Sequence, residues 1–166
     1  MKKGLIILML SAFAVIPVFA QKPVKLGYLN SQELLQIIPG RDSAQSNLQL
    51  YARDLENTMK AMETEFQTRY SEYVSNQNQM SDLIKQTKQR ELQDMQGRIE
   101  DFQRGAQEEL QQKEAELLKP LIDRAKQAIA DVAKENKYTY IFDAAGLLYQ
   151  EDSDDTLPLV KKKLGI

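Results

Sequence analysis

The side chains of this chain that could do chemistry are almost all carboxylates. Adjacent acids occur at Glu100-Asp101 and Glu108-Glu109, and such pairs can serve as general acid and base. Both pairs lie in a long segment rich in Gln, Glu, Lys and Arg, a composition typical of a helix surface in water. The acidic run Asp152–Asp155 could hold calcium, but it lacks the central Gly and the final Glu of an EF-hand loop. We interpret all of these acids as solvated.

Other kinds of catalytic site have no support in the sequence. The chain has no His and no Cys, which removes the commonest catalytic base, thiol nucleophiles and most zinc sites. Its seven Gly residues never form a GxxxxGK[ST] phosphate-binding loop. We therefore predict no catalytic residues, no cofactor, no metal site and no use of ATP: the protein is not expected to be an enzyme.

The first twenty residues are typical of a secretory signal. Lys2 and Lys3 precede an apolar run, Leu5–Phe19, and small residues stand at the −1 and −3 positions of a cleavage site after Ala20. A retained membrane anchor is the alternative, but the run is shorter than the ~20 residues that a spanning helix needs, and it contains Pro17. We predict that the mature chain is exported, without a stable membrane anchor.

The charge of the exported part argues against nucleic-acid binding. Without residues 1–20 the chain has 20 basic and 24 acidic residues, a formal net charge of −4, whereas nucleic-acid binders are usually basic. With no Cys, stability must come from packing.

Residues 24–40 predict a strand followed by a short helix. Val24–Leu29 is a short β-like run, Asn30 or Ser31 can cap the helix that follows, and Pro39-Gly40 ends it. From Arg41 the chain is strongly helical, and its apolar residues recur in steps of 3, 4, 4, 3, 4, 4 and 3: Leu48, Tyr51, Leu55, Met59, Met62, Phe66, Tyr70 and Tyr73. This eleven-residue repeat predicts a nearly straight coiled coil.

The pattern lapses at Ser75–Gln79, and Ser81 or Asp82 could cap a new helix. One continuous helix is the alternative. However, Pro39-Gly40 and Pro120 lie about 40 residues to either side of Met80, so a turn there would bring both disruptions to the same height. We predict a long antiparallel helical hairpin over residues 41–136, with its tip at 76–82.

The end of the chain, residues 137–166, predicts strand, turn and strand over Tyr138–Gln150, then an acidic loop and a short helix from Thr156. The hairpin returns the chain to its start, so Tyr138–Phe142 can pair with Val24–Leu29. The predicted fold class is α+β, mostly α: a coiled-coil arm on a small β-rich body made of residues 21–40 and 137–166. Three short strands form a poor independent core, so we expect several chains to associate.

The two ends also carry a resemblance. "KLGYLNSQELLQIIPG" and "YIFDAAGLLYQEDSDDTLPLVKKKL" resemble the Skp/OmpH family of periplasmic chaperones. The resemblance implies a homotrimer whose β-rich bodies assemble and whose three arms enclose a cavity. It further implies unfolded outer-membrane β-barrel proteins as clients, held without nucleotide, and delivery to the outer-membrane assembly machinery. The alternative function is a structural coiled-coil spacer of the cell envelope that holds no client.

Three groups of residues follow from this interpretation. The predicted trimer body uses Leu26, Tyr28, Tyr140, Ile141, Phe142 and Leu148. Met59, Met62, Phe66, Tyr70 and Tyr73 form either the seam between the arm helices or an adaptable client surface. Lys85, Lys88 and Arg90 give the tip a net charge of +2 over Ser75–Arg90, against −5 over Glu91–Glu116. These cations either attract clients or are simply solvated side chains at the end of the arm. Well-known members of the family are basic, so the acidic balance is a departure, and it leaves lipopolysaccharide binding without support.

Overall fold

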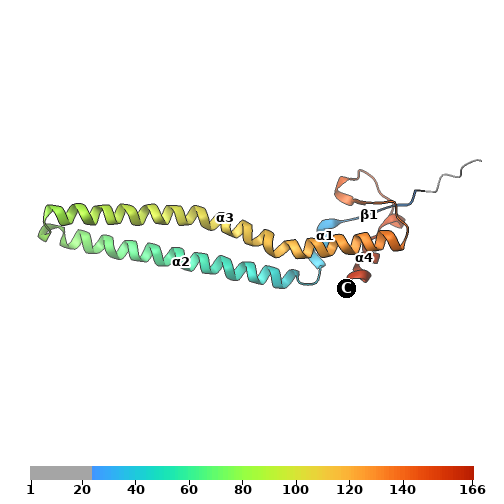
Figure 1. Ribbon diagram of the computed structural model, residues 1–166, viewed down its shortest axis with the longest axis horizontal. Helices are drawn as coiled ribbons and strands as arrows, with labels where there is room; N and C mark the ends of the chain where they lie inside the picture. The colour runs from blue at the N-terminus through green and yellow to red at the C-terminus, as the bar shows by residue number, and fades with distance from the viewer. Residues whose placement is uncertain (1–23) are drawn as a thin grey trace, which may run out of the picture.

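The computed structural model describes residues 24–166, and the predicted signal peptide lies outside them. Figure 1 shows two long helices side by side, joined by a turn at one end, with a small group of short elements gathered at the other. The order of elements is β1, α1, α2, a 3₁₀ turn, α3, β2, two further 3₁₀ turns and α4. The predicted class, mostly helical with long packed helices and a small sheet, is confirmed.

The sheet has two parallel strands, β1 (Leu26–Leu29) and β2 (Tyr140–Asp143), with Leu26 opposite Tyr140. Parallel strands need a long crossover, and here the whole helical hairpin provides it. The other edge of β1 is partly covered, because the backbone N–H of Thr156 donates to the Tyr28 carbonyl at 2.8 Å and its hydroxyl donates to the same oxygen at 2.9 Å. In this sheet β2 therefore forms an open edge.

The prediction of a second strand before Gln150 is wrong for the single chain. After β2 the backbone makes a 3₁₀ turn at Ala144–Gly146, in which the Asp143 carboxylate accepts from the N–H of Ala145. Residues 147–150 follow outside any strand. The open edge of β2 stays free, because the 3₁₀ turn takes the chain back over β1. There Leu147 and Tyr149 line a cavity with Leu26, and Asp155 then forms a bridge to Tyr28.

Capping side chains and a glycine set the starts of the first three helices. The Asn30 side chain accepts from the N–H groups of Gln32 and Glu33, which caps α1 (Ser31–Ile37). Gly40, with φ of 98°, adopts the left-handed conformation that starts α2 (Arg41–Asn76). A 3₁₀ turn (Gln77–Gln79) then leads to α3 (Asp82–Glu135), which is capped by Ser81. Both predicted caps are confirmed.

The antiparallel packing of α2 and α3 brings the two helix-disrupting sites, Pro39-Gly40 and Pro120, to the same position along the hairpin, as predicted. A Cβ added at Gly40 would lie 3.2 Å from Cδ2 of Leu121, so the break before α2 stands beside the residue that follows Pro120. Pro120 itself lies inside α3, which continues to Glu135. The last third of α3 thus extends past the start of α2 and runs beside the strands and α4, as Figure 1 shows.

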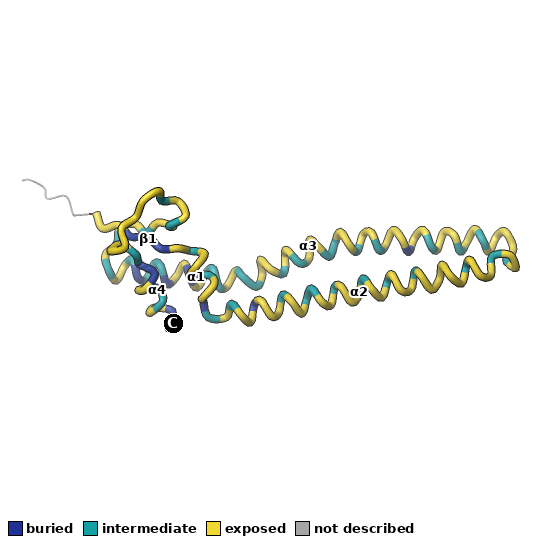
Figure 2. Tube along the Cα trace, turned by 180° about the vertical axis from the view of Figure 1, so that it is seen from behind, coloured by how far each residue is buried: buried dark blue, intermediate teal, exposed yellow. Residues whose placement is uncertain are grey.

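The buried core lies at that end. It joins residues of β1, α1, the last third of α3, and α4 (Leu157–Leu164): Leu29, Leu34, Ile38, Ala125, Ala128, Val132, Leu157, Val160 and Leu164. We call residues 24–40 and 120–166 the body, and residues 41–119 the arm. In the arm only Ala44 and Met95 are buried, so it is mostly exposed along its length (Figure 2). Among the described helices, none has an apolar stretch long enough to span a bilayer.

Candidate functional site

The body exposes an apolar surface around its open strand. Tyr140 and Phe142 project from β2 with 59% and 44% of their surface exposed, and their ring centroids are 6.1 Å apart. Leu26, on the neighbouring strand, is also exposed, and Leu148 and Tyr149 lie almost wholly in solvent. We call these five residues the body face. A body with so small a core would normally bury large side chains of this kind, so the body face is a candidate interface.

A cavity of about 250 Å³ extends this surface between β1 and the loop after β2. Leu26, Phe142, Leu147 and Tyr149 supply its apolar lining, and Glu151 and Asp154 supply carboxylates at its edge. The cavity could receive one or two apolar side chains from another molecule.

Two of the six residues predicted for trimer formation are largely covered within the body. Tyr28 is buried in the body, and Ile141 is half-buried against the core. Leu26, Tyr140, Phe142 and Leu148 remain on the surface. Alternation along β2 places Ile141 on the face opposite to that of Tyr140 and Phe142. Tyr28 stands opposite Phe142 in the register of the sheet, but other parts of the body cover it. A role of any of them in trimer formation stays a prediction.

The position of β2 is fixed by a polar contact at its end. The Ser31 hydroxyl donates to the Asp143 carboxylate, joining the start of α1 to the end of the strand. This hydrogen bond, with a second from the N–H of Ala145, holds the pKa of Asp143 below its usual value. Across the sheet, the Lys25 ammonium lies 4.0 Å from the centre of the Tyr138 ring.

In the arm, the predicted seam residues lie between the two helices to different degrees. Met59, Met62, Phe66 and Tyr73 are half-buried, whereas Tyr70 is 50% exposed and stacks on Phe66 with 6.2 Å between centroids. Polar bridges join the helices along the same line. The Tyr51 hydroxyl donates to Glu109 at 2.8 Å, and this bond is the main cause that raises the pKa of Tyr51.

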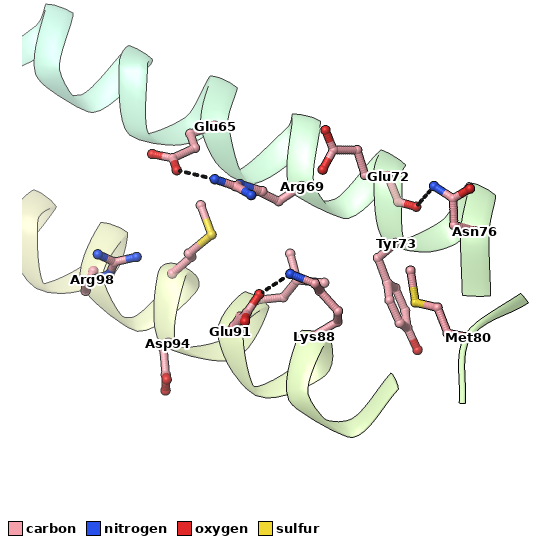
Figure 3. Close-up of a pocket in the computed structure, with 12 residues that line it drawn as sticks. Glu65, Arg69, Glu72, Tyr73, Asn76, Met80, Lys88, Glu91, Asp94 and Arg98 are labelled. Carbon is pink, nitrogen blue, oxygen red and sulfur yellow. Dashed lines mark hydrogen bonds and ion pairs between the residues drawn. The ribbon is translucent and has the colours of Figure 1, made fainter. Parts of the chain in front are cut away.

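One flank of the arm is hollowed near the tip (Figure 3). The hollow measures about 900 Å³ and lies between the end of α2 and the start of α3. We call it the arm groove. It is lined by Glu65, Arg69, Glu72, Tyr73, Asn76, Met80, Lys88, Glu91, Leu92, Asp94, Met95 and Arg98. In Figure 3 the side chains of Tyr73 and Met80 lie alongside each other at the tip end, and ion pairs Glu65–Arg69 and Lys88–Glu91 border the hollow.

Comparison with known proteins decides the family. The sequence profile described as "Outer membrane protein (OmpH-like)" matches residues 25–164, nearly the whole described chain. The chain belongs to the OmpH-like family. This is a family of non-enzymatic periplasmic chaperones, as the resemblance implied.

A solved structure agrees at the level of the fold. A crystal structure from Caulobacter crescentus CB15, described as that of an OmpH-like outer membrane chaperone, superposes with a TM-score of 0.75. It is 11% identical in sequence, and the match covers 85% of this chain and 83% of that one. No curated protein sequence gives a significant match.

The tip of this OmpH-like chain is less cationic than its sequence indicates. Lys85 lies 3.7 Å from Asp82, and Lys88 lies 2.7 Å from Glu91, so local acids partly neutralise two of the three predicted cations. Exposed apolar side chains also lie there, since Leu83 is 71% and Ile84 is 49% exposed. Client attraction by Lys85, Lys88 and Arg90 stays a prediction.

Sequence reasoning missed the arm groove of this OmpH-like chain. Its floor and rim combine residues from α2 and α3 that are separated by up to 33 positions, and their contact depends on the register of the two helices. The one available signal was Met80 beside the lapse in the apolar pattern. Within residues 24–166, no group of acids is arranged to hold a metal ion.

Proposed function

We propose that this chain is an exported, ATP-independent holdase of the periplasm. Its clients are unfolded outer-membrane β-barrel proteins, and its working form is a homotrimer whose arms enclose a cavity. Export would remove residues 1–20. Membership of the OmpH-like family supports the chaperone class, and the geometry of the body and arm supports the mechanism.

The body face is the observation that best supports a trimer. β2 offers an open strand edge, Tyr140 and Phe142 stand exposed on it, and the segment at Leu148 and Tyr149 has no strand partner among residues 24–166. Exposed strand edges pair readily with other chains. Equivalent segments from neighbouring copies would complete the sheet and bury these rings.

The arm supports a cage for a disordered client. It is long, nearly all exposed and held by a narrow seam, so it presents a large surface for its mass. Many weak contacts inside a cavity would keep the client soluble without fixing its conformation. Release follows when folding into the membrane is more favourable, and this requires no nucleotide.

Dilution of a client from urea tests the holdase. A β-barrel membrane protein diluted into buffer should stay soluble when about one trimer per client is present, with no ATP. Light scattering measures the aggregate. Undiminished aggregation at a several-fold excess of chaperone would rule the proposal out. Crosslinking from the arm to the unfolded client separates the holdase from the alternative, a structural spacer, because a spacer should crosslink only to itself.

Substitution of Phe142 tests the assembly. Phe142→Asp places a charge on the body face and should abolish the trimer, while circular dichroism retains most of the helix signal. Ile166→Asp is the matched control, because Ile166 is similarly exposed, at 49% against 44%, but lies at the end of the chain. Light scattering after size-exclusion chromatography gives the mass. A Phe142→Asp protein that stays trimeric would remove the body face from the interface.

A further inference from the structure

We propose that the arm groove binds the client directly, by receiving uncharged apolar segments of the unfolded polypeptide between α2 and α3. This inference rests on the proposed function and assigns a place on the arm to the client. The exposed apolar side chains at the tip, Leu83 and Ile84, are then not the main contact, whereas the seam residue Tyr73 takes part because it lines the groove.

The groove has the size and floor of a binding site. Its volume of about 900 Å³ falls within the roughly 300–1,000 Å³ of pockets that bury drug-sized ligands, so several side chains of an extended peptide would fit. Tyr73, Met80, Leu92 and Met95 provide apolar surface in it. A smaller hollow lined by Met62, Met95 and Ile99 continues along the same flank.

The methionines favour a varied partner. Residues 24–166 contain four methionines, Met59, Met62, Met80 and Met95, and all four lie in the arm or at its tip. Three of them line the groove or its continuation. Met side chains are flexible and polarizable, and proteins that bind many different sequences use Met-rich surfaces for this reason.

The charges around the groove favour an uncharged segment. Its lining carries three cations, Arg69, Lys88 and Arg98, and four acids. Two of the cations are paired with lining acids: Arg69 with Glu65, and Lys88 with Glu91. A strongly charged peptide would meet repulsion as well as attraction along such a lining. Strands of a β-barrel that alternate apolar and uncharged polar side chains match it.

The opposite flank of α2 is the competing site. Tyr70 and Val74 are exposed there, on the far side of the seam residues Phe66 and Tyr73. They occur one turn apart on a single helix. A client there would contact a convex surface, which buries less area for each contact.

Site-specific photo-crosslinking separates the two flanks. A benzophenone amino acid is placed at Glu72 or Arg98 in the groove, and at Gln67 or Gln96 on the other flank; all four positions are exposed. The full-length mature protein is mixed with a urea-denatured β-barrel membrane protein and irradiated. Groove positions should give several-fold more client adduct. Equal or greater yield from Gln67 and Gln96 would overturn the inference, as would groove adducts only to a second copy of this chain.

A filling variant tests the groove by affinity. Glu72→Trp places an indole into the groove and should weaken client binding roughly tenfold, the loss typical of blocking one important contact. Gln67→Trp adds the same ring to the same helix on the opposite flank and should leave the affinity within about twofold. Fluorescence titration with labelled client measures both. Unchanged affinity in Glu72→Trp would overturn the inference.

The two proposals fail in distinguishable ways. If the unmodified protein neither binds the client nor prevents its aggregation, the holdase proposal is wrong. If it does both, but crosslinks arise from the control flank or the Trp at position 72 has no effect, only the groove assignment is wrong.

Discussion

The body and the arm are built on opposite physical principles. The body buries nine side chains in one cluster, which joins the start of the chain to the last third of α3 and to α4. The arm, though longer, buries only Ala44 and Met95. Its ion pairs are exposed and mostly join residues three or four positions apart on one helix, for example Arg104–Asp101 and Arg69–Glu65.

This difference indicates that most of the stability of the chain comes from the body, whereas the arm contributes less. Burial of apolar surface is the dominant favourable term in folding, so the body should fix the geometry of the chain. The arm depends on local helix contacts and a half-buried seam, which leaves surface free for a changing partner. Substitutions should therefore cost far more in the body than at equivalent residues of the arm.

The largest expected effect comes from the buried core. Leu34→Ala removes a side chain of α1 that is 1% exposed and should lower the free energy of unfolding by about 2–5 kcal/mol. Leu55→Ala, at a half-buried seam position of the arm, should cost roughly half as much. Urea unfolding at one fixed protein concentration, followed by circular dichroism, measures both. Equal losses would mean that the arm is as tightly packed as the body.

A second, smaller effect compares the replacement by Ala of one glycine in the body and one in the arm. A Cβ at Gly27 in the body would lie 2.6 Å from Cγ2 of Thr156 and 2.9 Å from the Tyr138 ring, so Gly27→Ala should cost about 1–3 kcal/mol. Gly97 in the arm has nothing within 4 Å of its added Cβ. Gly97→Ala should stabilise α3 by up to about 1 kcal/mol. The opposite signs would appear as opposite shifts of the thermal midpoint, and shifts of the same sign would contradict the model of packing given above.

A third, smaller effect concerns Thr156, the one polar side chain that is buried among residues 24–166. The Thr156 hydroxyl, fully buried, donates to the Tyr28 carbonyl at 2.9 Å. Thr156→Val keeps the shape but loses this bond, at a cost of about 0.5–1.5 kcal/mol, because the backbone N–H of residue 156 still satisfies the carbonyl. Thr58→Val in the arm loses only an exposed bond to the carbonyl of Asp54 and should change the unfolding free energy by less than about 0.5 kcal/mol.

The smallest effect is a dependence on pH. The Ser31 hydroxyl lowers the pKa of Asp143, so the ionised carboxylate stabilises the fold at pH above its unfolded value of about 3.9. This contribution is lost as the pH falls through the lower, folded value. Ser31→Ala should therefore destabilise the protein slightly at neutral pH, and the difference from the unmodified protein should vanish in strong acid. A difference that grew with acidification, in urea midpoints taken across this range, would reverse the assigned sign.

Much of the fold was predictable because it depends on local pattern. The caps at Asn30 and Ser81 follow from side chains that accept from nearby N–H groups. The turn near Met80 follows from the lapse in apolar spacing, and the pairing of the first strand with Tyr140–Phe142 follows from the return of the hairpin. The end motifs also carried the family resemblance.

Other features could not be read from the pattern. The second strand before Gln150 was predicted from its composition, but the 3₁₀ turn capped by Asp143 takes the chain away from the open edge of β2, and residues 147–150 form no strand. Ala125, Ala128 and Val132 show the same apolar spacing as the arm seam, yet they are buried in the body because α3 extends past the start of α2. Their environment depends on helix length and register together.

The sequence by itself determined the helical hairpin, its caps and its turn, because these depend on residue spacing along one chain, and its end motifs carried the resemblance to the family. Only the tertiary structure decided which side chains of β2 face solvent, which part of α3 belongs to the core, and where the arm is hollow. Those features arise between segments far apart in sequence, and their geometry is set by the register in which the two long helices pack.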